Sequence, residues 1–223
     1  DIDLVYWDYY NSSDEVLTGM IVQHQRFKAD TIFAGGIWTW AGPAADYRVT
    51  LTTTLPALKK CREMGVKEVF ATAWGDNGAE AIFLTTLYGL QMYAEIDYTG
   101  AYKPEEVAER FKVTTGGDAN SFLDLSAFNL APGMPPLGGC SNFLAKYMLY
   151  QDPIMPLCEA DVRKYDLVAH YGSLEEKYAK YAAEGRGELK LLFEFYKSLA
   201  KTLKIKCSWH KRSAECVRAK DYE

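Results

Sequence analysis

The fold class is decided by the stretch TIFAGGIW, which occupies residues 31–38 and is followed by Gly42 and Pro43. A short apolar run that ends at turn-forming residues is typical of a buried β-strand. Two further stretches share this character, LVYW at residues 4–7 and VKEVFATAW at residues 66–74. We therefore predict three strands in the N-terminal part of the chain.

The segments between these strands have the pattern of amphipathic helices. Residues 13–27 begin with a serine that can cap a helix, and in residues 50–64 apolar side chains recur every three or four positions. Strands that alternate with helices predict parallel pairing with right-handed crossovers. Residues 1–95 therefore indicate three successive βα units.

The remainder of the chain has helical spacing and no further strand signal. Pro104 precedes two acidic residues, which is the preferred start of a helix, and residues 161–183 and 188–203 are long amphipathic stretches. We therefore predict an α/β portion over residues 1–95 and a mostly α-helical domain over residues 96–223.

Composition excludes several classes of function. The net charge of -5 argues against a nucleic-acid partner, because phosphate binding needs clustered Lys and Arg. No apolar run approaches the length of a membrane span, so a membrane partner is not expected. Five cysteines at irregular spacing suggest reduced thiols and a cytoplasmic location, without a metal site or a cofactor. Because the chain opens inside a predicted strand, we expect a longer parent protein.

Aromatic and acidic residues gather where the predicted strands end. Sugars are bound by aromatic faces that stack on the pyranose ring and by carboxylates that accept hydrogen bonds from hydroxyls. In parallel α/β folds, functional groups collect at the carboxyl ends of the strands. Any one of these tryptophans alone would be expected in the core, but the joint pattern predicts a sugar site. Its candidate residues are Tyr6, Asp8, Trp38, Trp40, Trp74 and Asp76.

Three segments carry a family resemblance: VYWDY at residues 5–9, FAGGIWTWAG at residues 33–42 and FATAWGDNGAE at residues 70–80. They resemble the last three strand ends in the barrel of glycoside hydrolase family 20 β-N-acetylhexosaminidases. The helical region resembles, more loosely, the domain that follows this barrel in one bacterial branch. The resemblance implies strands 6 to 8 of a (β/α)8 TIM barrel over residues 1–95.

The resemblance also implies an exo-acting, retaining enzyme that removes terminal N-acetylglucosamine or N-acetylgalactosamine from a glycan. In such enzymes the acetamido oxygen of the substrate attacks the anomeric carbon, so no protein nucleophile is required. Tyr6 would donate its hydroxyl to that oxygen, and Asp8 would accept from sugar hydroxyls. Trp74 would stack on the ring or form a wall of the acetamido pocket, and Asp76 would accept from outer hydroxyls. Many relatives have the longer Glu at the position of Asp76.

The family resemblance leaves two points open. Trp38 and Trp40 are expected as pocket walls, and the sequence does not decide which of them faces the sugar. The adjacent Asp–Glu pair that supplies the general acid lies on an earlier strand of the family barrel. The pair Asp14–Glu15 reads instead as the acidic first turn of a helix. We therefore expect the isolated chain to be inactive.

Two other functions fit the same residues. The chain could be a non-catalytic carbohydrate-binding or structural module, or Asp8 and Asp76 could bind a hard cation. A partial barrel exposes two sheet edges and an apolar interior, so we expect the isolated chain to self-associate.

Overall fold

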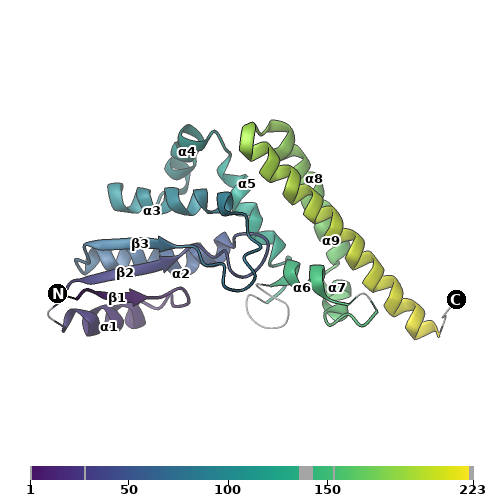
Figure 1. Ribbon diagram of the computed structural model, residues 1–223, viewed down its shortest axis with the longest axis horizontal. Helices are drawn as coiled ribbons and strands as arrows, with labels where there is room; N and C mark the ends of the chain where they lie inside the picture. The colour runs from purple at the N-terminus through teal and green to yellow at the C-terminus, as the bar shows by residue number, and fades with distance from the viewer. Residues whose placement is uncertain (1, 28, 136–142, 153, 221–223) are drawn as a thin grey trace. The chain divides into compact units, whose positions relative to one another are not determined.

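The computed structural model describes residues 2–27, 29–135, 143–152 and 154–220, and the chain divides into two compact units (Figure 1). The first unit comprises residues 1–40 and 45–123. The second comprises residues 124–223 together with the short segment Ala41–Ala44. The predicted division of the chain between residues 95 and 96 stays a prediction.

The first unit contains a three-stranded parallel sheet. Its strands are β1 (Leu4–Trp7), β2 (Thr31–Gly36) and β3 (Glu68–Thr72), and β2 lies in the centre. Helices α1 (Asp14–Gln25) and α2 (Tyr47–Glu63) connect them. The prediction of alternating parallel strands and helices is therefore confirmed for this segment.

The register of the strands gives the sheet two different faces. Tyr6 pairs with Phe33, and Phe33 pairs with Val69, so these side chains share one face, which α1 and α2 cover. Trp7 pairs with Ala34, and Ala34 pairs with Phe70, on the opposite face. Side chains alternate along a strand, and Trp7 is 60% and Phe70 44% exposed. The second face is therefore open.

Side-chain caps determine where the connecting helices begin. The Ser13 hydroxyl accepts from the Val16 amide at the start of α1, as the sequence predicted. Helix α2 begins three residues earlier than expected, because Asp46 accepts from the Val49 amide at 3.2 Å and so acts as its N-cap. Asp46 is completely buried.

The first unit continues with helices that pack around aromatic side chains. After the 3-10 turn η1 (Phe83–Thr86) come α3 (Leu87–Thr99), α4 (Pro104–Thr115) and α5 (Ala119–Leu123). Pro104 does begin a helix, as predicted. Helices α3 and α4 each end at a glycine with positive φ, Gly100 and Gly116, a conformation that costs glycine little. Edge-to-face contacts link the buried rings of this region, which are Tyr47, Tyr88, Phe111 and Phe122.

The second unit is helical in its described part. It contains the 3-10 turn η2 (Asp124–Phe128), α6 (Leu144–Tyr150), α7 (Glu159–Lys164), α8 (Leu167–Glu184) and α9 (Gly187–Ala219), and α8 packs along α9 (Figure 1). Their shared core includes Phe128, whose ring lies 5.4 Å from Tyr178 and 5.3 Å from Tyr196. A mostly helical C-terminal region is therefore confirmed.

Two helix boundaries differ from the sequence prediction. The single helix expected over residues 161–183 is interrupted at Asp166, which has a φ of 43° and accepts from the Ala169 amide as N-cap of α8. The helix expected to end at residue 203 continues to Ala219. The basic segment after residue 203 lacks a stop signal, which is why the helix can extend.

The cysteines correct one expectation. Cys158 is disulfide-bonded, whereas Cys61, Cys207 and Cys216 are free, so the prediction of five reduced thiols is wrong for Cys158. Cys140 lies outside the described residues.

Among the helices of the described residues, none combines the length and the apolar character needed to cross a membrane.

Candidate functional site

The exit of β1 holds Tyr6 and Asp8 together. The Tyr6 hydroxyl donates to Asp8 Oδ2 at 2.6 Å. The same carboxylate accepts from the Tyr10 amide at 3.0 Å and from the Asn11 amide and side-chain Nδ2 at 3.0 and 2.8 Å. Burial acts to raise the pKa of Asp8, but the hydrogen bonds outweigh it and hold the pKa below its ordinary value. Asp8 is therefore an ionised, fully hydrogen-bonded acceptor at neutral pH.

The Tyr6 side chain is packed as well as hydrogen-bonded. It is 2% exposed, and its ring lies 5.3 Å from His24 of α1 and 5.5 Å from Phe33 of β2. Burial and the bond to Asp8 raise the pKa of its hydroxyl far above the ordinary value. Tyr6 therefore remains a protonated donor at every physiological pH. His24 itself contacts the Met20 carbonyl oxygen of its own helix through Nδ1 at 2.8 Å.

An aromatic cluster joins the exits of β1 and β2. The Trp38 and Trp40 rings lie 4.7 Å apart, and both are buried. Tyr9 contacts Trp40 ring to ring at 5.3 Å, and its carbonyl oxygen accepts from Trp38 Nε1 at 3.0 Å. Tyr10 meets Trp38 edge to face at 5.3 Å. These contacts give the two tryptophans fixed orientations.

Tyr9 also reaches the exit of β3. Its hydroxyl accepts from Trp74 Nε1 at 2.9 Å, and the Trp74 carbonyl oxygen accepts from the Thr39 hydroxyl at 2.9 Å. Trp74 is 39% exposed and lies 5.7 Å from the Trp7 ring, on the side of the open sheet face. Asp76, two residues further on, is exposed. Trp74 and Asp76 are therefore the accessible members of the candidate set.

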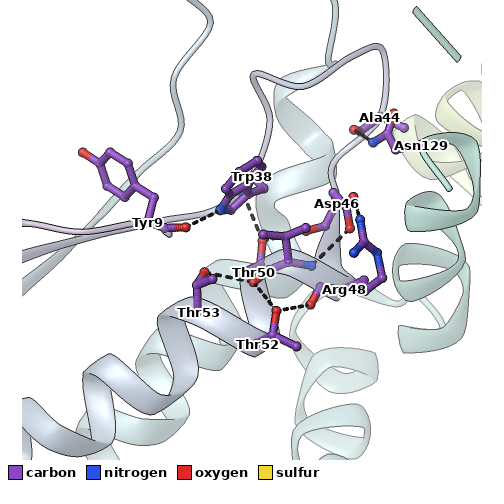
Figure 2. Close-up of polar contacts among 10 residues, drawn as sticks. Tyr9, Trp38, Ala44, Asp46, Arg48, Thr50, Thr52, Thr53 and Asn129 are labelled. Atoms are coloured by element: carbon purple, nitrogen blue, oxygen red, sulfur yellow. Dashed lines mark hydrogen bonds and ion pairs between the residues drawn. The ribbon is translucent and has the colours of Figure 1, made fainter. Parts of the chain in front are cut away.

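Helix α2 fixes the backbone at the exit of β2 (Figure 2). The Trp38 amide donates to the Thr50 hydroxyl at 3.0 Å, and the Trp38 carbonyl oxygen accepts from the Asp46 amide at 2.8 Å. One turn further along the helix, the Thr54 hydroxyl donates to the Gly36 carbonyl oxygen at 2.7 Å. These bonds satisfy the buried polar groups that follow the strand. Burial raises the pKa of Asp46, against the opposing effect of Arg48 at 3.0 Å.

The possibility of a cation at Asp8 and Asp76 gains no support from the geometry. Within the residues that the structure describes, no group of three or more His, Cys, Asp and Glu side chains could hold a metal ion. Asp8 is engaged with four hydrogen-bond donors. Its carboxylate oxygens already have partners.

The structure adds two residues that the sequence analysis did not single out. Tyr9 connects three of the tryptophans through one side chain and one carbonyl oxygen, and Asn11 donates two hydrogen bonds to Asp8. A signal for Asn11 was present, because an Asp followed three residues later by Asn favours a local turn closed by side-chain to backbone bonds. Tyr9 could not be distinguished by pattern from its neighbour Tyr10.

The parallel βα units and the aromatic and carboxylate site define the class as an α/β protein with the groups of a carbohydrate site. Residues 120–223 match the family described as the Glycoside Hydrolase 20C C-terminal domain. This match covers less than half of the chain and is consistent with the C-terminal part of a glycoside hydrolase family 20 protein, so the resemblance seen in the sequence is confirmed for this region. A comparison with curated proteins finds no match. The family match does not extend to Tyr6, Asp8 or the aromatic cluster, whose roles stay predictions.

Proposed function

We propose that this chain is the C-terminal part of an exo-acting, retaining β-N-acetylhexosaminidase that hydrolyses terminal N-acetylglucosamine or N-acetylgalactosamine by substrate-assisted catalysis. In this proposal β1, β2 and β3 are strands 6 to 8 of a TIM barrel. The observation that carries it is the Tyr6–Asp8 pair beside a tryptophan cluster, in the same chain as a family 20 C-terminal domain.

The protonation states of the pair suit this chemistry. A protonated Tyr6 can donate to the acetamido oxygen while that oxygen attacks the anomeric carbon, and the bond stabilises the charge that develops on the acetamido group. In the free chain the hydroxyl donates to Asp8, so substrate must take over this donor. The ionised Asp8 can accept from sugar hydroxyls once Tyr6 turns away.

The accessible residues suit recognition of the outer part of the sugar. In the proposal, Trp74 offers its exposed ring for stacking on the pyranose, while Asp76 accepts from outer hydroxyls. Trp38 and Trp40 are buried against each other, and in this proposal they support the pocket wall. The general acid would come from an earlier strand of the parent.

The test is hydrolysis of a chromogenic β-N-acetylglucosaminide by the full-length parent and by this chain, side by side. The proposal expects activity in the parent, a loss of about 10² to 10³ in kcat for Tyr6→Phe, and none in the chain. Asp8→Ala should reduce parent activity further, because it removes both a sugar contact and the partner of Tyr6. A parent without activity on either N-acetylhexosaminide would indicate a carbohydrate-binding module, and an active chain would contradict the assignment of the acid.

We also propose that the isolated chain self-associates through the open face of its sheet. Val5 is 40%, Trp7 60% and Phe70 44% exposed there, and such apolar faces favour association. Light scattering after size exclusion should show dimers or larger species that Trp7→Lys reduces. Trp209→Lys changes an equally exposed tryptophan on α9 and should leave the distribution unchanged. A monodisperse monomer at high concentration would contradict this proposal.

The cytoplasmic location stays a proposal, and the disulfide at Cys158 weighs against it. Disulfides persist in oxidising compartments, whereas cytoplasmic thiols are kept reduced. Alkylation of the parent in intact cells, followed by mass spectrometry, measures the state of Cys158. Complete alkylation would support the cytoplasm, and protection from alkylation would place the protein in an oxidising compartment.

A further inference from the structure

The loop that follows β2 belongs to the second compact unit, although the sequence on both sides of it belongs to the first. It consists of Ala41, Gly42, Pro43 and Ala44, and all four residues are buried. The first of them directly follows Trp40 of the aromatic cluster. The last is separated by one residue from Asp46, the cap of α2.

Two buried side chains of the helical unit hold this loop by its carbonyl oxygens. The Tyr196 hydroxyl of α9 donates to the Pro43 carbonyl oxygen at 2.7 Å. Asn129 donates through Nδ2 to the Ala44 carbonyl oxygen at 3.0 Å (Figure 2). Both side chains are fully buried, so their bonds do not compete with water.

The composition of the loop matches this mode of attachment. Pro43 has a fixed φ, which stiffens the segment that carries the two acceptors. A Cβ at position 42 would lie 3.0 Å from Asn129 Oδ1, so glycine leaves room for the amide beside it. Both loop ends then meet residues with fixed partners: Trp40 packs on Trp38, and the Asp46 amide donates to the Trp38 carbonyl oxygen.

We propose that Tyr196 and Asn129 are positioning residues, which hold the loop and thereby restrict Trp40 and Asp46, the residues that flank it along the chain. Holding the Pro43 and Ala44 carbonyl oxygens restricts the loop, and the covalent chain passes this restriction to Trp40 and Asp46. The catalytic consequence of this inference rests on the proposed function, whereas the restriction of the loop does not.

Hydrogen exchange of single amides in this chain tests the restriction. Tyr196→Phe removes only the hydroxyl, and we expect the Asp46 amide to exchange about fivefold to tenfold faster, as the loss of one net hydrogen bond allows. Tyr181→Phe is the matched control, because it removes a tyrosine hydroxyl of the same unit that donates to Asp124 at 2.6 Å. The amides of α1 report whether the chain has loosened as a whole.

Hydrogen exchange tests the loop restraint and the kinetics of the parent test the proposed function, so the two can fail independently. Unchanged exchange at Asp46 in Tyr196→Phe, or equal acceleration in Tyr181→Phe, would overturn the positioning role. In the active parent, Tyr196→Phe should raise KM several-fold with a smaller change in kcat, and Asn129→Leu should act in the same direction. A parent inactive on N-acetylhexosaminides would remove the proposed substrate, while faster exchange at Asp46 would still establish the loop restraint.

Discussion

The two compact units use large aromatic side chains in different ways. In the second unit Tyr171, Tyr178 and Tyr196 are fully buried and form a core with Phe128. In the first unit Trp7 and Trp74 are partly exposed beside an open sheet face, while their neighbours make specific polar bonds. The comparison teaches that aromatic content alone does not indicate a site.

The largest expected difference in unfolding free energy is between a substitution of a buried core ring and a substitution of a ring on the open sheet face. Phe128→Ala should lower the free energy of unfolding by about 3–5 kcal/mol, because it leaves a cavity beside the buried rings of Tyr178 and Tyr196. Trp7→Ala, at a ring that is 60% exposed, should change it by less than about 1 kcal/mol. Urea unfolding followed by circular dichroism measures both. Equal losses would mean that the open face is packed in solution.

A smaller effect distinguishes the two acids of the candidate site. Asp8→Asn should cost about 1.5–3 kcal/mol at pH 7, because it removes a charge that accepts four hydrogen bonds. Asp76→Asn makes the same chemical change at an exposed position and should cost less than about 0.5 kcal/mol. Equal costs would contradict the buried, hydrogen-bonded state of Asp8.

The pH dependence of the Asp8→Asn effect follows from the lowered pKa. Because the folded pKa lies below the unfolded value of about 3.9, the stabilisation is fully present above about pH 5. It is lost as the pH falls through the folded pKa. The difference in unfolding free energy between the two proteins should therefore shrink below about pH 4, and a difference that grows there would contradict the assignment.

The smallest expected loss of stability distinguishes Tyr9 from Tyr10 within the aromatic cluster. Tyr9→Phe removes the acceptor of the Trp74 indole N–H and should cost about 1 kcal/mol. Tyrosine 10 is 68% exposed, so Tyr10→Phe is the control and should have little effect. The near-ultraviolet circular dichroism of the tryptophans should change only in the first variant. A change of the same size in both would indicate that Tyr9 does not orient Trp74.

The sequence was sufficient for the local elements and insufficient for the contacts between them. Short apolar runs that end at turn-forming residues located all three strands, and the Ser13 and Pro104 signals located the starts of α1 and α4. The start of α2 was missed because Asp46 acts as a buried cap in a segment without helical periodicity.

The candidate site shows the same limit. Pattern reasoning selected Tyr6 near the end of one strand and Asp8 directly after it, and alternation by two places both on one face, where they bond to each other. It could not supply Tyr9 as the link to Trp74, or Tyr196 as a donor to Pro43, because these pairs are distant in sequence and the bonds depend on tertiary packing. Such long-range polar contacts can be identified only from the three-dimensional structure.

The most direct test of the central claim uses the parent enzyme and two chromogenic substrates that differ only in the 2-acetamido group. Substrate-assisted catalysis requires that group as the nucleophile, so the account predicts hydrolysis of the β-N-acetylglucosaminide and negligible hydrolysis of the β-glucoside. It also predicts that Tyr6→Phe reduces kcat on the former. Comparable rates on both substrates, insensitive to Tyr6→Phe, would contradict the proposed mechanism and the role assigned to the Tyr6–Asp8 pair.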